Sequence, residues 1–410
     1  MDVIKKTNVI FIILFCCLHL TGCSEADVQQ NIQNQLNDYV QQAQDEYSHV
    51  QETESGQEQE TQQSTEIPVE TESETLSDIY YAYHTLDKEE QRLYLEIWHA
   101  LADMKTDAKV STLDTEQLNR VFQYVLADHP ELFYVEGYQY TKYTTAGVLT
   151  ELTFTGSYSM SRDMMQQTAR QIEEAVNNMI APLEQITDQY TIVRYLYDAL
   201  ITSTEYDSNA ANNQNIQSVF LQGRSVCQGY AKAMQYLLQK KGMQAVLVTG
   251  YTNGEGHAWN LVRVNNAYYY LDPTWGDASY SQADDGTGQA GPIPAINYDY
   301  FLVTTQELFK THQLDDNMPV PQCTAVEDNY YVHEGLYLNS YNEDMIKMIF
   351  QNAIMNGSSY ITMKCCDAQV YSEVQNRLIE EQEVFRFLGS EGGSIAYTVN
   401  PTQLTISFWL

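Results

Sequence analysis

One short segment constrains the fold more than any other: two runs of β-forming residues, AWNLVRV and AYYYLD, separated only by Asn265-Asn266. This spacing predicts a β-hairpin, because asparagine tolerates the positive φ that a two-residue turn needs. Counting back from the turn pairs Trp259 with Asp272, and directly opposed residues project from the same face of a sheet. His257, two residues before Trp259, shares that face. The register therefore predicts that His257 and Asp272 are diagonal neighbours, within reach of a hydrogen bond.

The segment GRSVCQGYAKAMQYLLQKKG, residues 223–242, predicts a helix that begins near a cysteine. Ser225 is a favourable N-cap, apolar residues follow at helical spacing, and Gly242 suits the position after the last turn. Cys227 then lies in the first turn, where unpaired backbone N–H groups favour a thiolate and could also donate to an oxyanion. Gly229 is expected to keep the approach to the sulfur open.

Four roles are open to Cys227: a buried thiol, half of a disulfide, a metal ligand or a nucleophile. A lone cysteine is usually a small buried hydrophobic residue. No CxxC pair or Cys/His ladder suggests zinc. The helix start would supply a thiolate, and the hairpin end would supply His257 and Asp272. Together they favour a nucleophile, its base and the group that orients the base. This combination suits acyl transfer from an amide through a thioester.

The same residues resemble a known family. GRSVCQGYAKAM, GHAWNLVRV and YYYLDPTWGD resemble the three motifs of the transglutaminase-like superfamily, in its bacterial secreted branch, over roughly residues 190–311. The KTH stretch that ends at His312 also resembles sequence that closes the domain in that branch. The resemblance implies an α+β fold with a papain-like core, in which a nucleophile helix packs on an antiparallel sheet. It also implies Cys227 as nucleophile, His257 as base and acid, and Asp272 as the residue that orients the base.

The resemblance says less about the reaction. Members of the family include protein cross-linkers, deamidases, peptidases, peptide amidases and inactive binding forms. Nothing in the chain resembles the calcium sites or accessory β-domains of the animal cross-linking enzymes, so we expect no metal and no cofactor.

Further residues are candidates for the cleft, each with an ordinary alternative. Gln222, five residues before Cys227, could donate to an oxyanion, as a glutamine upstream of the nucleophile does in papain-like enzymes; the alternative is a solvated loop residue. Trp259 could wall the cleft or pack in the core, and Trp275 carries the same ambiguity. Tyr206 is another candidate for the cleft.

The N-terminus predicts export. Lys5 and Lys6 precede an apolar run at 9–20 that is short for a bilayer span and fits the hydrophobic part of a signal peptide. The run ends in LTGC, which resembles the bacterial lipobox, so we expect residues 1–22 to be removed as a lipoprotein signal peptide. The alternative is an ordinary secretory signal with an incidental cysteine. Two acyl chains on Cys23 would anchor the protein durably to the membrane, outside the cytoplasm.

Charge and composition divide the rest of the chain. The 21 Lys and Arg against 55 Asp and Glu give a formal net charge of −34, which repels nucleic acid, so we expect no such partner. Residues 23–75, rich in Gln, Glu, Ser and Thr, are expected to form a disordered acidic tether. An N-terminal α/β region at 76–185, the catalytic domain at 186–322 and a small C-terminal α/β domain at 323–410 then follow.

Periodicity locates elements within these parts. Helices are predicted at 87–104, 114–127, 162–180 and 188–204, with a hairpin between the second and the third. In the C-terminal part we expect strand, helix, strand, helix and a final hairpin. Cys365 and Cys366 lie in an apolar run that predicts a core strand, and a disulfide from one of them to Cys323 is open.

These features together predict a surface-anchored, cysteine-dependent acyl transferase or amidohydrolase that acts on protein or cell-wall peptides through a thioester on Cys227. The alternative is a catalytically silent module of the same fold that binds a cell-surface peptide or glycan. The intact cysteine, histidine and aspartate argue against the silent module, because binding alone does not need all three.

Overall fold

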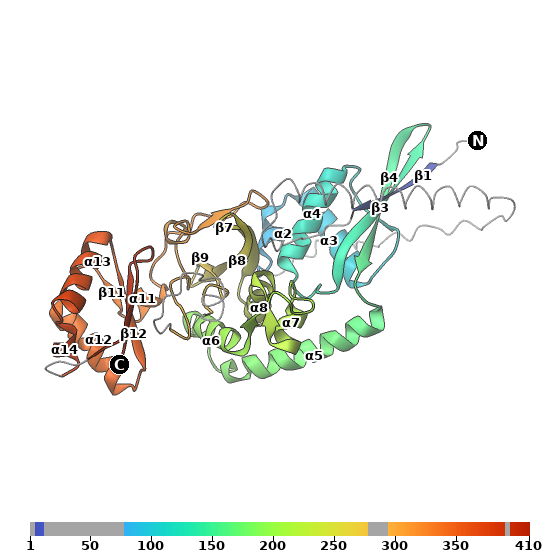
Figure 1. Cartoon of the computed structure of the whole chain (residues 1–410). Helices are drawn as coiled ribbons and strands as arrows, with labels where there is room; N and C mark the ends of the chain where they lie inside the picture. Colours follow the sequence, from blue (N-terminus) through green and yellow to red (C-terminus); the bar gives the residue numbers. More distant parts are fainter. Residues whose placement is uncertain (1–4, 12–77, 278–293, 390–393) are drawn as a thin grey trace.

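The computed structural model describes residues 5–11, 78–277, 294–389 and 394–410 (Figure 1). The predicted tether and the predicted lipidation site, Cys23, lie outside the described residues. Within these ranges, no helix is both long enough and apolar enough to span a bilayer.

The N-terminal region combines helices with an antiparallel sheet of strand order β1-β3-β4-β2. Its elements are α2 (Tyr81–Thr85), α3 (Lys88–Ala102), α4 (Thr115–Asp128), β1 (Lys5–Phe11), β2 (Ala108–Lys109), β3 (Val135–Thr145) and β4 (Val148–Tyr158). Asp87 and Asp114 cap α3 and α4 by accepting backbone N–H groups of the first turn, which explains why both helices begin close to their predicted starts. Strand β1 falls within the predicted signal peptide and pairs with β3; removal of that peptide stays a prediction.

Four helices lead from this sheet to the candidate site: α5 (Arg162–Ile180), α6 (Gln189–Ser203), α7 (Ile216–Gln222) and α8 (Cys227–Lys240). Helices α5 and α6 have the predicted bounds to within a residue. Two short parallel strands, β5 (Glu205–Tyr206) and β6 (Arg224–Ser225), hold the chain after α6 beside the chain that enters α8.

The central sheet has the order β10-β7-β8-β9, with all neighbours antiparallel. Its strands are β7 (Ala245–Thr252), β8 (Glu255–Val264), β9 (Ala267–Leu271) and β10 (His312–Leu314). Asn265 and Asn266 take φ of 48° and 68°, and Val264 pairs with Ala267, so the predicted turn and register are confirmed. Strand β10 was not predicted, because three residues are too few to show an alternating pattern.

Helix α8 joins the central sheet to the N-terminal region. Asn260 of β8 donates from Nδ2 to the carbonyl oxygen of Ala231 at 2.9 Å, which holds the helix on the sheet. On another face, Gln235 donates to the carbonyl oxygen of Ala127 at 2.7 Å, and Gln239 reaches Asp128 in the same way at 2.8 Å. These amides satisfy carbonyl groups at the end of α4 that have no partner within the helix. One apolar core accordingly runs from α2 through α8 to β9.

The C-terminal part is a small α/β unit with an apolar core of its own and a sheet of order β11-β12-β14-β13. Its elements are β11 (Tyr337–Leu338), α12 (Glu343–Met355), β12 (Tyr360–Cys365), α13 (Ala368–Gln375), α14 (Val384–Phe387), β13 (Tyr397–Asn400) and β14 (Thr405–Trp409). Several side chains attach it to the central sheet region. Lys364 Nζ lies 2.9 Å from Oε2 of Glu307 in α10 (Thr305–Leu308), Gln403 donates to the hydroxyl of Tyr300 at 3.1 Å, and Asn400 and Thr405 donate to Asp299.

Two local predictions about helix α8 are wrong. The cap residue is Val226, which has no capping side chain, because the Ser225 hydroxyl is held 2.7 Å from the carbonyl oxygen of Asn213. Gly229 does not face the sulfur. A Cβ there would come within 1.9 Å of the Ser225 hydroxyl and 2.8 Å of the Asn213 carbonyl, so the glycine is needed for the close approach of these segments.

The cysteines of the described part are all free, so the disulfide considered for Cys323 is not formed. Cys365 is the last residue of β12 and is buried, as predicted for a core strand. Cys366 lies after the strand and is partly exposed, which corrects its predicted place in the core. The fold as a whole is α+β, with a helix packed on an antiparallel sheet as predicted.

Candidate active site

The hairpin brings His257 and Asp272 together as its register predicts. His257 lies near the start of β8, and Asp272 follows the last residue of β9. The Nε2 atom of His257 lies 2.7 Å from Oδ2 of Asp272, and both side chains are buried. Because a carboxylate only accepts hydrogen bonds, Nε2 carries the proton, and Nδ1 is the ring nitrogen left for chemistry.

The backbone beyond β9 holds the carboxylate in place. Oδ1 of Asp272 accepts the backbone N–H groups of Thr274 and Trp275 at 2.9 and 3.1 Å. Burial alone would raise the pKa of Asp272, but attraction to His257 and hydrogen bonds from His257 and His312 hold it well below its usual range. The carboxyl group is therefore ionised throughout the neutral range.

His312 is a member of this cluster that the sequence did not assign to the site. Its Nε2 atom lies 3.0 Å from the same oxygen of Asp272, and its Nδ1 lies 2.8 Å from the hydroxyl of Thr311. The side chain is fully buried. The only signal for it was the KTH stretch, which resembled a domain-closing sequence without suggesting a role. Strand β10 brings His312 to the site by pairing with β7, next to the strand that carries His257.

Cys227 is the first residue of α8 and lies beside the start of β8. It packs in a small apolar cluster with Ala231, Leu247 and Ala258, of which the last directly follows His257 in the sequence. The thiol thus occupies a helix N-terminus, where backbone N–H groups stabilise an anion, next to the strand that carries the histidine. Cys227 is 6% exposed, so access to the sulfur is narrow.

Aromatic rings enclose the histidines. Trp259 is fully buried and lies nearly parallel to the His257 ring, with centroids 5.8 Å apart. It also meets His312 edge-on at 5.0 Å, so it is at once a core residue and a wall of the cluster. Trp275 lies 4.9 Å from His312 and 6.2 Å from His257. These rings exclude water from the hydrogen bonds around Asp272.

The other sequence candidates lie around the helix start. Gln222 ends α7, is exposed and donates from its amide to the carbonyl oxygen of Ala211 at 3.2 Å. Tyr206 lies in β5 and pairs with Ser225, two residues before Cys227. A role for either in binding an oxyanion or lining the cleft stays a prediction.

The cluster also has the donor set of a metal site. One ligand atom from each of His257, Asp272 and His312 lies within 4.8 Å of the others. In the structure, Nε2 of each histidine is hydrogen-bonded to Oδ2 of Asp272.

Part of the chain matches a known protein family. Residues 176–273, which contain Cys227, His257 and Asp272, match the family model of the transglutaminase-like superfamily. This part of the chain is a transglutaminase-like domain. Helix α8 and the hairpin of β8 and β9 thus lie within the matched residues, and His312 lies outside them.

Individual relatives are distant. The chain is 22% identical to kyphoscoliosis peptidase of Mus musculus over 219 residues, covering 47% of this chain and 32% of the relative. The human protein of that name is 22% identical over 237 residues, covering 52% and 34%. The chain therefore spans about a third of the length of these curated relatives.

Similar solved structures include a TGase, at 14% identity and a TM-score of 0.25, covering 37% of this chain and 45% of that one. Another is the periplasmic domain of TgpA from Pseudomonas aeruginosa bound to ethylmercury, at 12% identity and a TM-score of 0.22, covering 34% and 72%.

Proposed function

We propose that the transglutaminase-like domain is a cysteine-dependent acyl transferase or amidohydrolase. The observation that carries the proposal is the 2.7 Å contact between His257 Nε2 and Asp272 Oδ2, at the start of the strand beside Cys227. It supports a base of defined tautomer next to a thiol at a helix N-terminus, which is the arrangement that nucleophilic catalysis needs.

In the first half of the reaction, Nδ1 of His257 takes the proton of the Cys227 thiol. The thiolate attacks the carbonyl carbon of an amide, and the N–H groups at the start of α8 offer donors to the oxygen as it gains charge. The imidazolium then gives its proton to the departing nitrogen. The C–N bond breaks, an amine or ammonia leaves, and the acyl group stays on the sulfur as a thioester.

In the second half, His257 removes a proton from the incoming amine or water. That nucleophile attacks the thioester carbonyl, the C–S bond breaks, and the proton returns to the sulfur. An amine gives a cross-link or an exchanged amide, and water gives deamidation or hydrolysis. Asp272 stabilises the imidazolium in both halves and does not itself change protonation, since its pKa lies well below its usual range.

The substrate and location belong to the same proposal. We expect the domain to act on protein or cell-wall peptides outside the cytoplasm, where lipid on Cys23 anchors the chain and residues 23–75 act as its tether. The curated relatives whose name contains peptidase support amide chemistry in general and leave transfer and hydrolysis as alternatives.

Alkylation of Cys227 by iodoacetamide tests the activated thiol. We expect it to react at pH 6 faster than a free model thiol, and His257→Ala to abolish the difference. Mass spectrometry of glutaminyl and peptidoglycan-derived peptides, with and without a primary amine, then separates transfer from hydrolysis. If no peptide changes mass and Cys227→Ala behaves as the wild type does, the silent binding module replaces the enzyme as the better account.

A further inference from the structure

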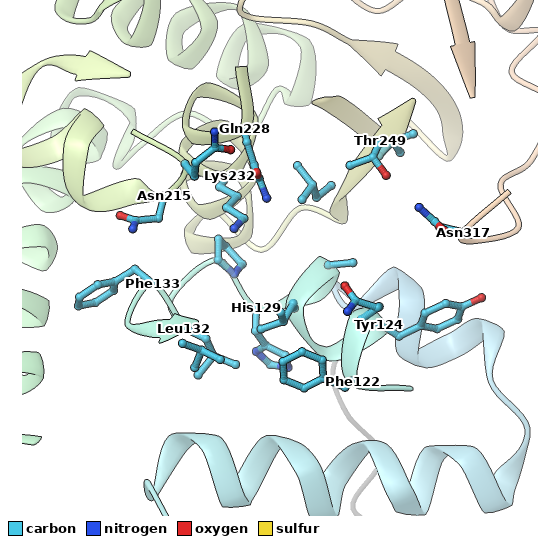
Figure 2. Close-up of a pocket in the computed structure, with 18 of the residues that line it drawn as sticks. Phe122, Tyr124, His129, Leu132, Phe133, Asn215, Gln228, Lys232, Thr249 and Asn317 are labelled. Atoms are coloured by element: carbon cyan, nitrogen blue, oxygen red, sulfur yellow. The ribbon is translucent and has the colours of Figure 1, made fainter. Parts of the chain in front are cut away.

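A cavity of about 770 Å³ lies between the N-terminal region and the transglutaminase-like domain (Figure 2). One wall comes from α4 and the loop after it, with Phe122, Leu132 and Phe133. The facing wall comes from α8, with Gln228 and Lys232. Its volume falls in the range of pockets that enclose small ligands or short peptide segments.

The cavity reaches the neighbourhood of the candidate nucleophile. Gln228 lines it and directly follows Cys227 in α8. Leu247 lines it from β7 and packs against Cys227 in the small apolar cluster. A ligand in the cavity would therefore lie against the helix turn and the strand that hold the thiol.

Lys232 is the one lysine or arginine among the residues that line the cavity, whose carboxylates, Glu136 and Asp315, form no ion pair with it. Over the part of the chain that the structure describes, its ammonium group makes no ion pair and no hydrogen bond. Desolvation by the surrounding protein lowers the pKa of Lys232 to about 8, and no carboxylate opposes that shift. The chain has a net charge of −34, and a bound anion would stabilise the charged form of this buried, unpaired ammonium group.

Amide side chains provide most of the remaining polar lining, which also includes His129, Ser159 and Thr249. Gln214 is one of the lining residues, and its buried Oε1 atom finds no hydrogen-bond partner among the described residues. Gln228 also presents its side-chain amide to the cavity, as Figure 2 shows, whereas Asn215 caps α7 by accepting the backbone N–H of Gln217 at 2.9 Å. Amides that both donate and accept match the N–H and C=O groups of a peptide backbone. The apolar wall of Phe122 and Leu132 suits side chains of small or medium size.

We propose that this cavity binds a short peptide bearing a free carboxylate, with Lys232 receiving the carboxylate and the amide-lined wall receiving the peptide backbone. The inference rests on the proposed function in that the bound peptide would belong to the substrate of Cys227. It specifies that substrate as an anionic peptide. The net negative charge of the chain repels anions elsewhere on the protein.

Binding to the full-length chain carrying Cys227→Ala tests the cavity without any thioester chemistry. The probes are N-acetyl-trialanine with a free carboxylate, the same peptide ending in a carboxamide, and acetate, titrated calorimetrically up to about 10 mM. We expect the carboxylate peptide to bind at least about tenfold more tightly than the carboxamide and than acetate, because only it uses both the cation and the amides.

Variants at position 232 then test whether Lys232 causes the preference for the carboxylate peptide. Lys232→Met should remove the discrimination between carboxylate and carboxamide, and Lys232→Arg should keep it. Lys347→Met, a matched change at an exposed lysine of α12, should leave every affinity unchanged. Circular dichroism and unfolding midpoints show whether the position-232 variants stay folded.

Three results would overturn the inference: no binding of either peptide, equal binding of the two peptides by the wild-type cavity, or a preference that survives Lys232→Met. Equal affinity for acetate would overturn the peptide part and leave a simple anion site. None of these results affects the alkylation test of Cys227. Conversely, an unreactive thiol with intact carboxylate discrimination would reject the enzyme and keep the binding site.

Discussion

His312 and Asp272 are joined by a 3.0 Å hydrogen bond between Nε2 and Oδ2, so the carboxylate that holds His257 is itself held by a second imidazole. The other oxygen of Asp272 accepts backbone N–H groups of Thr274 and Trp275. Donors from β8, β10 and the turn after β9 thus converge on one buried group. Asp272 is the point at which three segments of the domain meet.

Replacing His312 should weaken this convergence. His312→Phe leaves Oδ2 with one donor in a buried site, which should cost about 1–3 kcal/mol in the free energy of unfolding. It should also raise the pKa of Asp272 and change the pH profile of Cys227 alkylation. Urea unfolding and alkylation rates measure the two effects. His312→Gln, which can still donate to the carboxylate, should restore part of both; an unchanged pH profile in His312→Phe would show that His312 only fills space.

Asp272→Asn should abolish activation of the thiol with little change in shape. Every polar contact of the Asp272 carboxylate is with a donor, so the new NH₂ group must face either the backbone N–H groups or the two histidines. Facing His257, it would favour the tautomer protonated on Nδ1, which cannot take a proton from Cys227. We expect a loss of about 10³-fold in the rate of Cys227 alkylation or more. Asp316→Asn, at an exposed aspartate, is the matched control, and an active Asp272→Asn would contradict the assigned role.

The cysteines should differ sharply in reactivity. Burial raises the pKa of Cys323 and of Cys365 to about 12, so each is almost wholly protonated at pH 8. We expect both to resist iodoacetamide in the native protein and to react once urea unfolds it, while Cys227 reacts in the native state. Peptide mapping by mass spectrometry after timed alkylation gives the three rates. Equal rates for Cys227 and Cys323 would remove the case for a special thiol environment.

Lys364→Met should loosen the C-terminal part in a pH-dependent way. Desolvation of Glu307 acts to raise its pKa, but Lys364 and Lys310 lower it below the ordinary 4.5. A lowered carboxyl pKa contributes stability above the unfolded-state value, and that contribution is lost as pH falls through the folded-state value. The wild type should therefore exceed Lys364→Met by about 1–3 kcal/mol at neutral pH, with a smaller gap in acid. Unfolding curves at pH 7 and below pH 4 measure this, and a gap that does not change with pH would contradict it.

Much of the local structure could be predicted from the sequence because it depends on neighbouring residues. Asp87 and Asp114 start their helices by accepting N–H groups two and three residues ahead. Asn265-Asn266 sets the hairpin register, and a period of two then places His257 and Asp272 on one face. Prediction of the helix cap at Ser225 was wrong because a distant loop residue, Asn213, holds that hydroxyl.

What the sequence determined by itself was the identity and order of the candidate groups, Cys227, His257 and Asp272, together with the turn that pairs the last two. Only the tertiary structure decided that His312, 40 residues beyond Asp272, completes the cluster. Only the tertiary structure also placed Lys232, without an ion pair, in a cavity beside the helix turn that holds the thiol. The physical reason is the range of the interactions. Caps, turns and register depend on residues a few positions apart, whereas contacts across β10, α4 and α8 exist only after separate elements have docked and buried a shared core.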